Sequence, residues 1–549
     1  MLGKTMQIIL VILLFWFAKL SDSWPLSTRS GWIIDKSSGH RFKLRCVNWA
    51  AHLQPMIAEG LNKKPSKDIA SHIVSNGFNC VRLTWATHMF TRYSNLTVAQ
   101  SLDRLALKEV MAGVAKNNGV LLNSTLVDAY EMVIDDLGFH NVAVVLDNHI
   151  SEPKWCCSND DGNGFFGDEN FDPNEWLQGL AIVANRFKDK PMVVAMSMRN
   201  ELRGPKQNQN DWYRYIQEGA TTIHGKNPHV LVIVSGLNYG TDLSFIKERP
   251  LELKLKNKLV YEAHWYSFDE QPPEKWLEQP YQVCANETQR FINQAGFLVQ
   301  GENPVPLFLS EFGVDERGVN GADNLFLGCL LALVAEMDLD WALWALQGSY
   351  YLRDGLIGPE ETYGLLDANW DHIRNPKIIE GLQLVQQILR DKKSHVKKYY
   401  IMYHPQSGHC IRVDKKEMYA SDCRTWSRWS YKGAGTPIRL MGTSWCLKAV
   451  GDGLPVILSI DCKSEQSRWE FASSSKFQIA ARDEHGIHLC LEWNPIPTNS
   501  SNILTKKCLC SEDESQCHEN PQSQWFKLIS SNSKQWKVPE VNEKRSSTS

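Results

Sequence analysis

The chain of 549 residues has no excess of charge of either sign. Its 59 Lys and Arg residues nearly balance 62 Asp and Glu residues, so the formal net charge is −3 and the isoelectric point is near 6.6. Nucleic acids and anionic membranes are recognised through a surplus of basic residues, so the composition gives no reason to expect either partner. A neutral polymer such as a polysaccharide is compatible with this balance.

Long apolar runs are also scarce. One stretch, Ile8–Ala18, follows Lys4 and precedes small and polar residues at 21–23. It is too short to span a bilayer well and no stop-transfer segment follows it, which is the pattern of a secretory signal peptide over residues 1–23. An uncleaved membrane anchor is the alternative. We expect a mature protein that begins near Trp24 and is secreted to the extracellular space or the cell wall.

The cysteine content agrees with an oxidising compartment. Fourteen cysteines are present, and disulfides persist mainly in secreted proteins. Four Asn-x-Ser/Thr sequons are candidate glycosylation sites, namely Asn95, Asn123, Asn286 and Asn499. Both features support secretion.

A chain of this length is expected to form two or more domains. Over residues 24–395, short apolar runs alternate with amphipathic stretches such as 176–187, 212–223, 287–295 and 324–337. This alternation predicts a parallel sheet, and eight units predict a (β/α)8 TIM barrel of the α/β class. A doubly wound open sheet is the alternative, but no Gly-rich phosphate loop follows the first run. The predicted strands are 44–50, 80–86, 142–150, 193–201, 230–236, 259–266, 307–313 and 341–347.

Two glutamates end two of these apolar runs. Glu201 closes the run that starts at Val193, and Glu311 directly follows Pro306–Ser310. Strand propensity does not call for a carboxylate there, whereas the carboxyl ends of barrel strands are where chemistry is done. Two carboxylates at one mouth supply the acid and the nucleophile or base that cleave a glycosidic bond. The sequence therefore predicts a glycosidase.

After about residue 395 the pattern changes to a threefold repeat. In each repeat a second cysteine follows the first by 13 to 18 positions, and a Ser-[Arg/Gln]-Trp triplet closes the unit. Such a repeat predicts a symmetric all-β module over residues 398–530, and residues 531–549 are expected to form a disordered tail. The spacing does not suit zinc and predicts a disulfide framework. The expected pairs are Cys410 with Cys423, Cys446 with Cys462, Cys490 with Cys508, and Cys510 with Cys517.

The predicted barrel resembles glycoside hydrolase family five, the large cellulase-like family. The resemblance rests on eight positions that occur in order on the predicted strands. They are Arg82 on the second strand, His149 on the third, Asn200 and Glu201 on the fourth, His264 and Tyr266 on the sixth, Glu311 on the seventh and Trp344 on the eighth.

The resemblance implies a retaining double displacement at the two glutamates. Glu311 is then the nucleophile that forms a covalent glycosyl-enzyme, and Glu201 is the general acid and later the general base. Arg82 and Tyr266 are placed to hydrogen-bond Glu311 and keep it anionic. Asn200 is placed to hold the sugar 2-hydroxyl.

The other positions are implied to contact the substrate. His149 and His264 would bind hydroxyls and orient the acid/base, and Trp344 would form a platform beneath the reacting sugar. The implied substrate is a β-linked polysaccharide or oligosaccharide of the β-1,4-glucan or mannan type, and no cofactor is required.

Other interpretations of these residues stay open. The barrel could be a catalytically silent carbohydrate-binding protein, or a transglycosylase that uses the same residues. Arg82 could be a structural ion-pair partner. Asp147 and His149 could chelate a metal, although no third ligand has suitable spacing and we expect no metal.

The C-terminal repeat resembles the ricin B-type β-trefoil, a lectin-like module with a Gln-x-Trp signature. Here Ser replaces the Gln in all three units. The family's sugar-binding Asp is replaced by Arg412 and Lys448 in the first two repeats, and only Glu492 in the third is acidic. The resemblance implies the fold, whereas sugar binding is not expected to follow from it.

The loop over residues 155–166, after the third predicted strand, is rich in Gly, Asn and aromatic residues and is expected to line the cleft. A bond between the adjacent Cys156 and Cys157 would be strained. Each is therefore expected to bond a different partner among Cys46, Cys80, Cys284 and Cys329. Possible outer sugar subsites are Trp49, Trp85, Trp155 and Trp265, whereas Trp341 is expected to be core.

Overall fold

The computed structural model describes residues 25–534 apart from 270, 499–500, 511–516 and 518. The predicted signal peptide, the sequon at Asn499 and residues 535–549 of the predicted tail lie outside the described residues. The tail prediction is wrong at its first two residues, because Ser531 ends a strand and Asn532 exchanges hydrogen bonds with Asp391. Within them, no helix combines the length and the apolar character needed to cross a membrane.

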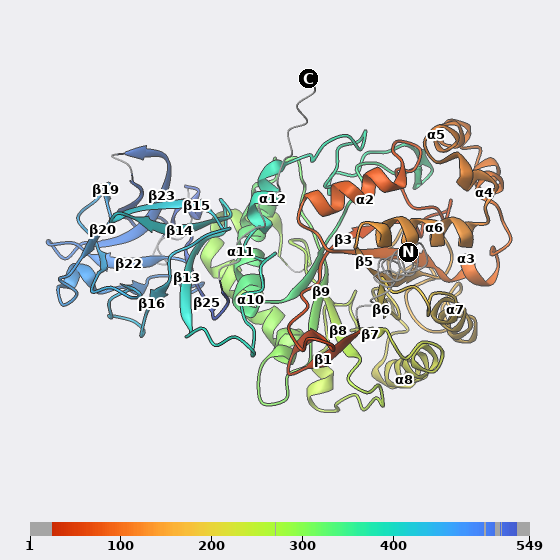
Figure 1. Cartoon of the computed structure of the whole chain (residues 1–549), viewed down its shortest axis with the longest axis horizontal. Helices are drawn as coiled ribbons and strands as arrows, with labels where there is room; N and C mark the ends of the chain where they lie inside the picture. The colour runs from red at the N-terminus through yellow and green to blue at the C-terminus, as the bar shows by residue number, and fades with distance from the viewer. Residues whose placement is uncertain (1–24, 270, 499–500, 511–516, 518, 535–549) are drawn as a thin grey trace, which may run out of the picture. The chain divides into compact units, whose positions relative to one another are not determined.

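Eight parallel strands form a closed barrel in which each strand pairs with the next and the last returns to the first (Figure 1). The predicted (β/α)8 fold is confirmed, because each of the eight apolar runs forms one of these strands. They are buried on both faces, which explains their continuous apolar character. Their bounds are β3 Arg45–Trp49, β4 Cys80–Ala86, β5 Ala143–Ile150, β6 Val193–Ser197, β7 Leu231–Ser235, β8 Leu259–His264, β9 Leu307–Phe312 and β10 Asp340–Leu343.

Three strands end at least two residues earlier than predicted. β6 ends at Ser197, β8 ends at His264 and β10 ends at Leu343. The site residues predicted beyond these ends, Asn200, Glu201, Tyr266 and Trp344, therefore lie in the segments that follow the strands. At Glu201 the backbone turns sharply, with φ at 22°. These side chains are thus presented by the segments that follow the strands, whereas Arg82, His149, His264 and Glu311 lie within β4, β5, β8 and β9.

Helices alternate with the barrel strands along the chain. Several begin at a side-chain cap: the Asn208 and Asp172 side chains accept hydrogen bonds from the first turns of α8 and α7. The predicted helices correspond to α7, α8, α10 and α11. The bounds are α2 Ser66–Ser75, α3 Thr87–Thr91, α4 Val98–Arg104, α5 Lys108–Asn118, α6 Leu126–Phe139, α7 Pro173–Arg186, α8 Gln209–Lys226, α9 Pro273–Glu278, α10 Pro280–Gln294, α11 Gly321–Met337 and α12 Pro376–Leu382.

The described chain divides into two compact units. The first contains the residues up to Trp265, Ile292–Gly313 and Asp340–Arg374, and so holds all eight barrel strands. It also holds two small hairpins, β1 Leu26–Arg29 with β2 Trp32–Asp35 and β11 Leu352–Arg353 with β12 Leu356–Ile357. The second contains Tyr266–Phe291, Val314–Leu339 and the residues from Asn375 onward.

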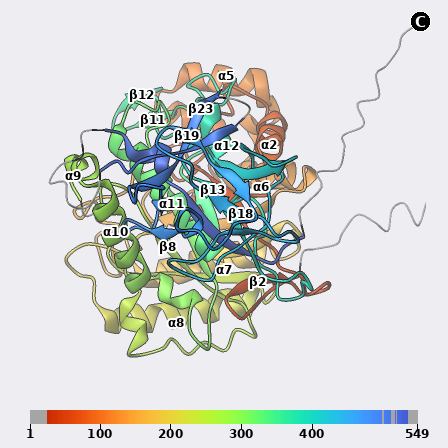
Figure 2. The same ribbon diagram turned by 90° about the vertical axis from the view of Figure 1, so that its left-hand side faces the viewer.

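The C-terminal part of the second unit is all-β and β-trefoil-like, as the repeat predicts. Its antiparallel strands enclose a core that includes Trp429, Trp469 and Phe526, and several of the strands face the viewer in Figure 2. The bounds are β13 Tyr399–His404, β14 His409–Asp414, β15 Glu417–Asp422, β16 Trp429–Ser430, β17 Arg439–Leu440, β18 Cys446–Lys448, β19 Leu454–Pro455, β20 Ile457–Ser459, β21 Glu470–Phe471, β22 Ile479–Arg482, β23 His488–Thr498, β24 Ser501–Lys507 and β25 Lys527–Ser531.

The third repeat tryptophan packs differently from the other two. Trp525 stacks on Phe477 at 4.6 Å between ring centroids and also contacts the Tyr281 ring of α10. A Cβ atom at Gly328 of α11 would lie 3.2 Å from the Trp525 ring, so this glycine allows the ring to approach the helix. The amide of Gln522 donates to the carbonyl of Asn324, 2.9 Å away. The all-β region therefore shares packing with α10 and α11.

The four expected C-terminal disulfides are all formed, but the expectation for the barrel cysteines is wrong. Cys46 bonds Cys80 because the two residues face each other in register on the adjacent strands β3 and β4. Cys284 of α10 bonds Cys329 of α11. The four expected partners of the loop cysteines therefore bond one another, and Cys156 bonds Cys157. The C-terminal pairs are Cys410–Cys423, Cys446–Cys462, Cys490–Cys508 and Cys510–Cys517.

Replacing Trp469 by Ala is expected to lower the free energy of unfolding of the all-β region by about 3–5 kcal/mol, because it removes a fully buried indole. The substitution also removes the hydrogen bond from the Trp469 indole to the Leu447 carbonyl. Denaturant titration followed by circular dichroism measures the change. The matched control is Trp445→Ala, at a partly exposed indole of the same region. Equal losses in the two variants would contradict the assignment of Trp469 to the core.

Candidate active site

Glu201 and Glu311 come together at the carboxyl end of the barrel. One carboxylate oxygen of each and a ring nitrogen of His264 all lie within 4.8 Å of one another. Nδ1 of His264 is 2.8 Å from Oε1 of Glu201 and 3.7 Å from Oε2 of Glu311. The two residues that end separate apolar runs in the sequence are therefore neighbours, with one imidazole between them.

A buried arginine links the site together. Arg82 lies on β4 with no exposure to solvent, and its Nη1 donates to Glu311 at 2.7 Å and to Asn48 at 3.0 Å. Its Nη2 donates to Asn200 at 2.8 Å and to Asp147 at 2.9 Å. Arg82 thus fixes groups from the ends of β3, β5, β6 and β9 around one charge. The register explains part of this, since Asn48 and Arg82 are directly paired on adjacent strands.

The surroundings of Arg82 contain more carboxyl groups than a single cation balances. Besides Glu311 and Asp147, the carboxylate of Glu262 lies 3.8 Å from Nη2 and accepts a hydrogen bond from Ser197 at 2.5 Å. Burial raises the pKa of both Asp147 and Glu262, and the positive charge of Arg82 opposes that shift. The site therefore favours retention of protons on some of its carboxyl groups.

Burial raises the pKa of Glu201 to about 7, against the opposing charges of Arg203 and Arg82. Burial also raises the pKa of Glu311 to about 7, opposed by His264 and Arg82 and reinforced by the negative charge of Glu201. Two close carboxyl groups with raised pKa values release their protons as a coupled pair. Because Arg82 donates directly to Glu311, the singly ionised pair carries its charge best on Glu311.

His149 is held as a neutral donor. Burial, together with the charge of Arg82, keeps its pKa well below the usual value, and its Nδ1 lies 2.7 Å from Oδ2 of Asp147. The ring lies parallel to Trp344, with 5.5 Å between centroids and 16° between planes. Both oxygens of Asp147 are engaged, one by Arg82 and one by His149. These contacts do not have the arrangement of an Asp-x-His chelate.

A second trio of metal-donor groups comprises His149, Cys156 and Cys157, whose ligand atoms lie within 4.8 Å of one another. The two sulfurs are bonded to each other and offer no thiolate. In the first trio, Glu201, His264 and Glu311, Arg82 occupies one carboxylate and His264 is bonded to the other. Neither arrangement calls for a cation.

A glycine allows Trp344 to approach Glu311. The backbone N–H of Trp344 donates to the carbonyl of Phe312 at 2.7 Å. A Cβ atom at Gly313 would lie 2.3 Å from the Trp344 carbonyl oxygen and 2.9 Å from the Tyr363 ring. Gly313 is thus required by close packing at this strand end.

Tyr266 belongs to the second unit, and its predicted bond to Glu311 stays a prediction. Within that unit its ring stacks on Phe268 at 5.0 Å, and its N–H donates to Asp269 at 2.9 Å.

The expectation of outer subsites is wrong for three tryptophans that are buried in the core, whereas Trp155 is partly exposed beneath the guanidinium of Arg353. The buried three are Trp49, Trp85 and Trp265, and Trp341 is buried as predicted.

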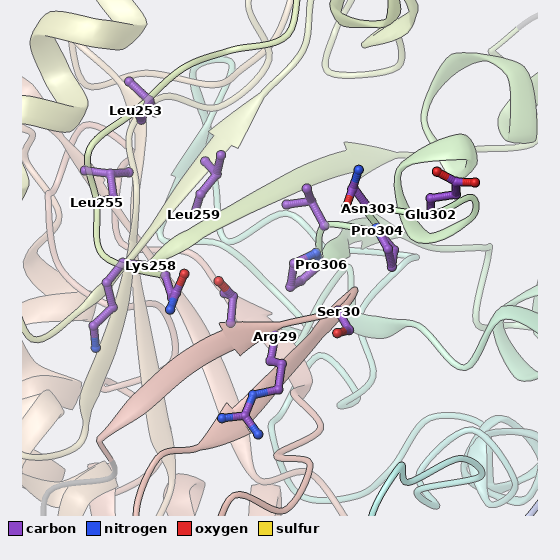
Figure 3. A pocket seen from close by; sticks show the side chains of 13 residues that line it. Arg29, Ser30, Leu253, Leu255, Lys258, Leu259, Glu302, Asn303, Pro304 and Pro306 are labelled. Atoms are coloured by element: carbon purple, nitrogen blue, oxygen red, sulfur yellow. The ribbon is translucent and has the colours of Figure 1, made fainter.

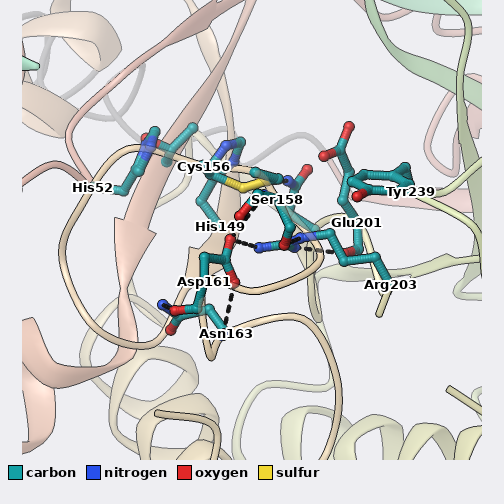
Figure 4. The surroundings of a disulfide bond; sticks show 12 residues. His52, His149, Cys156, Ser158, Asp161, Asn163, Glu201, Arg203 and Tyr239 are labelled. Carbon is teal, nitrogen blue, oxygen red and sulfur yellow. Dashed lines mark hydrogen bonds and ion pairs between the residues drawn. A yellow bond between two sulfur atoms is a disulfide. The ribbon is translucent and has the colours of Figure 1, made fainter. Parts of the chain in front are cut away.

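Arg203 was not singled out from the sequence. Its Nη1 donates to the backbone carbonyl of Glu201 at 2.8 Å and its Nε to that of Ser158 at 2.9 Å. Nη2 forms an ion pair with Asp161 (Figure 4). Arg203 therefore ties the loop after β5 to the backbone of Glu201. The sequence signal for Arg203 was its place two residues after Glu201. Asn48 was also missed, and its signal was an amide next to the apolar pair Cys46 and Val47 in the first predicted strand.

A separate cavity of about 490 Å³ lies at the amino ends of β8 and β9, lined by Lys258, Pro304 and Pro306 together with the β1 end at Arg29 (Figure 3). This is the opposite end of those strands from His264 and Glu311. Nζ of Lys258 donates to the carbonyl of His229 at 2.6 Å and to that of Leu26. The cavity takes no part in the site.

Comparisons with known proteins agree on one family. The description "Cellulase (glycosyl hydrolase family 5)" matches residues 38–349. A "Glycosyl hydrolase 5 family protein" of Chamaecyparis obtusa is 45% identical over 545 residues, covering 96% of this chain and 97% of that protein. An "Endoglucanase" of Paenibacillus polymyxa is 20% identical over 374 residues, covering 64% and 84%.

Solved structures share the fold. The catalytic domain of the major endoglucanase from Xanthomonas campestris pv. campestris superposes with a TM-score of 0.54 at 20% identity, covering 66% of this chain and 99% of that one. A Pyrococcus horikoshii endocellulase, described as a complex with cellotetraose, gives 0.53 at 20% identity, with coverage of 66% and 99%.

The raised pKa of Glu201 predicts a pH-dependent difference in stability. Neutral Glu201 contributes stability that is present below its ordinary pKa of 4.5 and is lost as the pH rises through about 7. Glu201→Gln removes this titration. The stability of the variant relative to the unmodified protein should therefore rise by about 1–3 kcal/mol between pH 5 and pH 8, measured by denaturant unfolding.

The control for this experiment is Asp128→Asn on α6. A hydrogen bond from Thr125 lowers the pKa of Asp128, so this residue is ionised throughout the same pH interval. The unfolding free energy of this variant relative to the unmodified protein should not change between pH 5 and pH 8. A flat or falling difference for Glu201→Gln would mean that Glu201 is not buried as a neutral acid.

Proposed function

The chain belongs to the cellulase family, glycosyl hydrolase family 5, and we propose that it is a secreted retaining β-glycosidase that hydrolyses a β-linked glucan by double displacement. The observation that carries the proposal is the pairing of Glu311, bonded to Arg82, with Glu201, bonded to His264. One carboxylate is thereby stabilised in its ionised form while its neighbour is free to hold a proton.

In the first step the ionised Glu311 attacks the anomeric carbon while Glu201 donates its proton to the departing glycosidic oxygen. This gives a covalent glycosyl-enzyme. In the second step Glu201 accepts a proton from water, the resulting hydroxide attacks the anomeric carbon, and Glu311 leaves as a carboxylate. Oxygens within 4.8 Å of each other support this course, because inverting enzymes need about 6.5–9.5 Å to admit water between the carboxyl groups.

The change of role at Glu201 follows from electrostatics. Glu311 carries a negative charge before the first step, which raises the pKa of Glu201 and favours its acid form. Once Glu311 is esterified, that charge disappears and the pKa of Glu201 falls. Glu201 then loses its proton more easily and can act as the base. The uncharged His264, whose pKa burial lowers, maintains the hydrogen bond to Glu201 in both steps.

The remaining residues are assigned to the substrate. Asn200 holds the 2-hydroxyl, His149 and His264 bind hydroxyls, and Trp344 provides the platform under the reacting sugar. Tyr266 is proposed as a second hydrogen-bond donor to Glu311.

The proposed substrate class is β-1,4-glucan, with mannan as the alternative. The relatives named as endoglucanases and the neighbour solved with cellotetraose support a glucan. Secretion is supported by the apolar N-terminal stretch, by the disulfides, and by the exposed positions of Asn95, Asn123 and Asn286, which we propose as glycosylation sites.

The domain boundaries are proposed as a signal peptide at 1–23, a catalytic barrel at 24–395, and a ricin B-type β-trefoil from 398 to the end of β25 at Ser531, followed by a tail. In the third repeat, Glu492 is buried and bonded to Lys506 and Gln524, each at 3.2 Å. This carboxylate is engaged within the protein, which supports a structural role for the trefoil rather than sugar binding.

The test compares the purified protein with Glu311→Gln and Glu201→Ala on soluble β-glucans, mannans, xyloglucan and aryl β-glycosides, with product anomers followed by NMR. The unmodified protein should release products of retained configuration. Glu311→Gln should lose at least about 10³-fold in kcat/KM, because it removes the nucleophile. Glu201→Ala should regain turnover of an activated aryl glycoside when azide is added, and should give the β-glycosyl azide.

Glu175→Gln, outside the site, should keep full activity. Products longer than the substrate would identify a transglycosylase. An absence of turnover on every substrate, with polysaccharide binding intact in the protein and in Glu311→Gln, would favour a catalytically silent binding protein instead. Inverted products would contradict the double displacement.

A further inference from the structure

The Cys156–Cys157 disulfide lies against Asn200, directly before Glu201. The amide nitrogen of Asn200 is 3.9 Å from Sγ of Cys156 and 3.8 Å from Sγ of Cys157. The other end of the same amide accepts a hydrogen bond from Arg82 at 2.8 Å. The side chain of Asn200 is therefore confined between a guanidinium at its oxygen and a pair of sulfurs at its nitrogen.

We propose that this disulfide is a specificity-determining element of the site, which orients the Asn200 amide so that its N–H groups recognise the 2-hydroxyl of the sugar bound at Glu311. The inference rests on the proposed function and deepens it. Sulfur is a weak hydrogen-bond acceptor. The disulfide can thus fix the position of the NH2 group while leaving its donor capacity available to a hydroxyl. A carboxylate or backbone carbonyl at the same position would accept strong hydrogen bonds from the NH2 group of Asn200. That group would then be less able to donate to a sugar hydroxyl.

Chain entropy does not account for this disulfide. A disulfide stabilises a protein chiefly by closing a loop in the unfolded chain, and the effect grows with loop length. Cys156 and Cys157 are separated by 1 position, so their bond closes no loop, whereas Cys46 and Cys80 are separated by 34. What the Cys156–Cys157 bond supplies is a fixed local shape beside Asn200.

The loop that carries the disulfide is independently anchored. Arg203 joins its Ser158 carbonyl and its Asp161 carboxylate to the backbone of Glu201, as Figure 4 shows. Asp161 also accepts hydrogen bonds from the N–H groups of Ser158 at 3.1 Å and Asn163 at 2.8 Å. These contacts fix the position of the loop relative to Glu201 and to the adjacent Asn200. They do so independently of the disulfide.

The burial of the two cysteines also separates their roles. Cys156 is 8% exposed and packs against Ala86 and Ile150 at the ends of β4 and β5. Cys157 is more exposed, and one nitrogen of His149 lies within 4.8 Å of both sulfurs. Cys156 is thus packed against the barrel. Both sulfurs lie next to Asn200 and His149, the two residues assigned to sugar hydroxyls.

The experiment measures discrimination for the 2-hydroxyl. Initial rates on an aryl β-glucoside and on its 2-deoxy counterpart give a ratio of kcat/KM values for the unmodified protein, for Cys156→Ala/Cys157→Ala, and for Asn200→Ala. We expect the double cysteine variant to lower this ratio at least about tenfold, chiefly by slowing the 2-hydroxylated substrate. Combining it with Asn200→Ala should lower the ratio little further, because both changes remove the same interaction.

The matched control is Cys410→Ala/Cys423→Ala, which removes a disulfide of the all-β region. It should leave the ratio unchanged but lower the unfolding midpoint more than the Cys156/Cys157 variant does, since it opens a loop with a separation of 13. If the alanine variant does not fold, Cys156→Ser/Cys157→Ser replaces it in the same comparison.

An unchanged ratio in a folded Cys156/Cys157 variant would overturn the inference while leaving the proposed hydrolysis intact. An equal fall in the Cys410/Cys423 control, or full additivity with Asn200→Ala, would also overturn it. If the unmodified protein cleaves neither these glycosides nor any polysaccharide, the proposed function itself fails and this inference fails with it.

Discussion

The positive charge of Arg82, held away from solvent inside the barrel, is the constraint on which the rest of the site depends. Its hydrogen bonds reach Glu311, Asp147, Asn200 and Asn48, which come from four different strands or their ends. A buried cation requires compensation, and several buried carboxylates require a cation. Each group therefore fixes the others, and the position of the Glu311 carboxylate is a consequence of this balance rather than of packing alone.

Burial and charge act in opposite directions on the two glutamates. Burial alone favours the neutral acid, which suits a proton donor, whereas Arg82 favours the anion, which suits a nucleophile. The arginine contacts Glu311 directly, while Glu201 faces the uncharged His264. The two carboxyl groups thus differ in their nearest neighbours, and this difference favours the anion at Glu311 and the neutral acid at Glu201.

The barrel and its two glutamates could be predicted because both leave strong local signals. Strands buried on both faces need continuous apolar runs, and a carboxylate at the end of such a run is conspicuous. Arg203 could not be found this way, because its partners Ser158 and Asp161 lie on a distant loop whose path the sequence does not specify. Strain argues against a Cys156–Cys157 bond, but Cys46 bonds Cys80 and Cys284 bonds Cys329, so each of the two loop cysteines has only the other as a partner.

The packing of Trp525 on α10 and α11 has a consequence for biosynthesis. Gln522 bonds Asn324 across 198 positions of sequence, and the Trp525 ring covers Gly328. A ribosome delivers α10 and α11 well before it delivers Trp525, so the apolar surface of these helices stays open to solvent until the final repeat emerges. The last part of the chain to be synthesised is thus needed to complete the surroundings of helices made much earlier. Nascent chains that stall before residue 525 therefore leave this apolar surface uncovered.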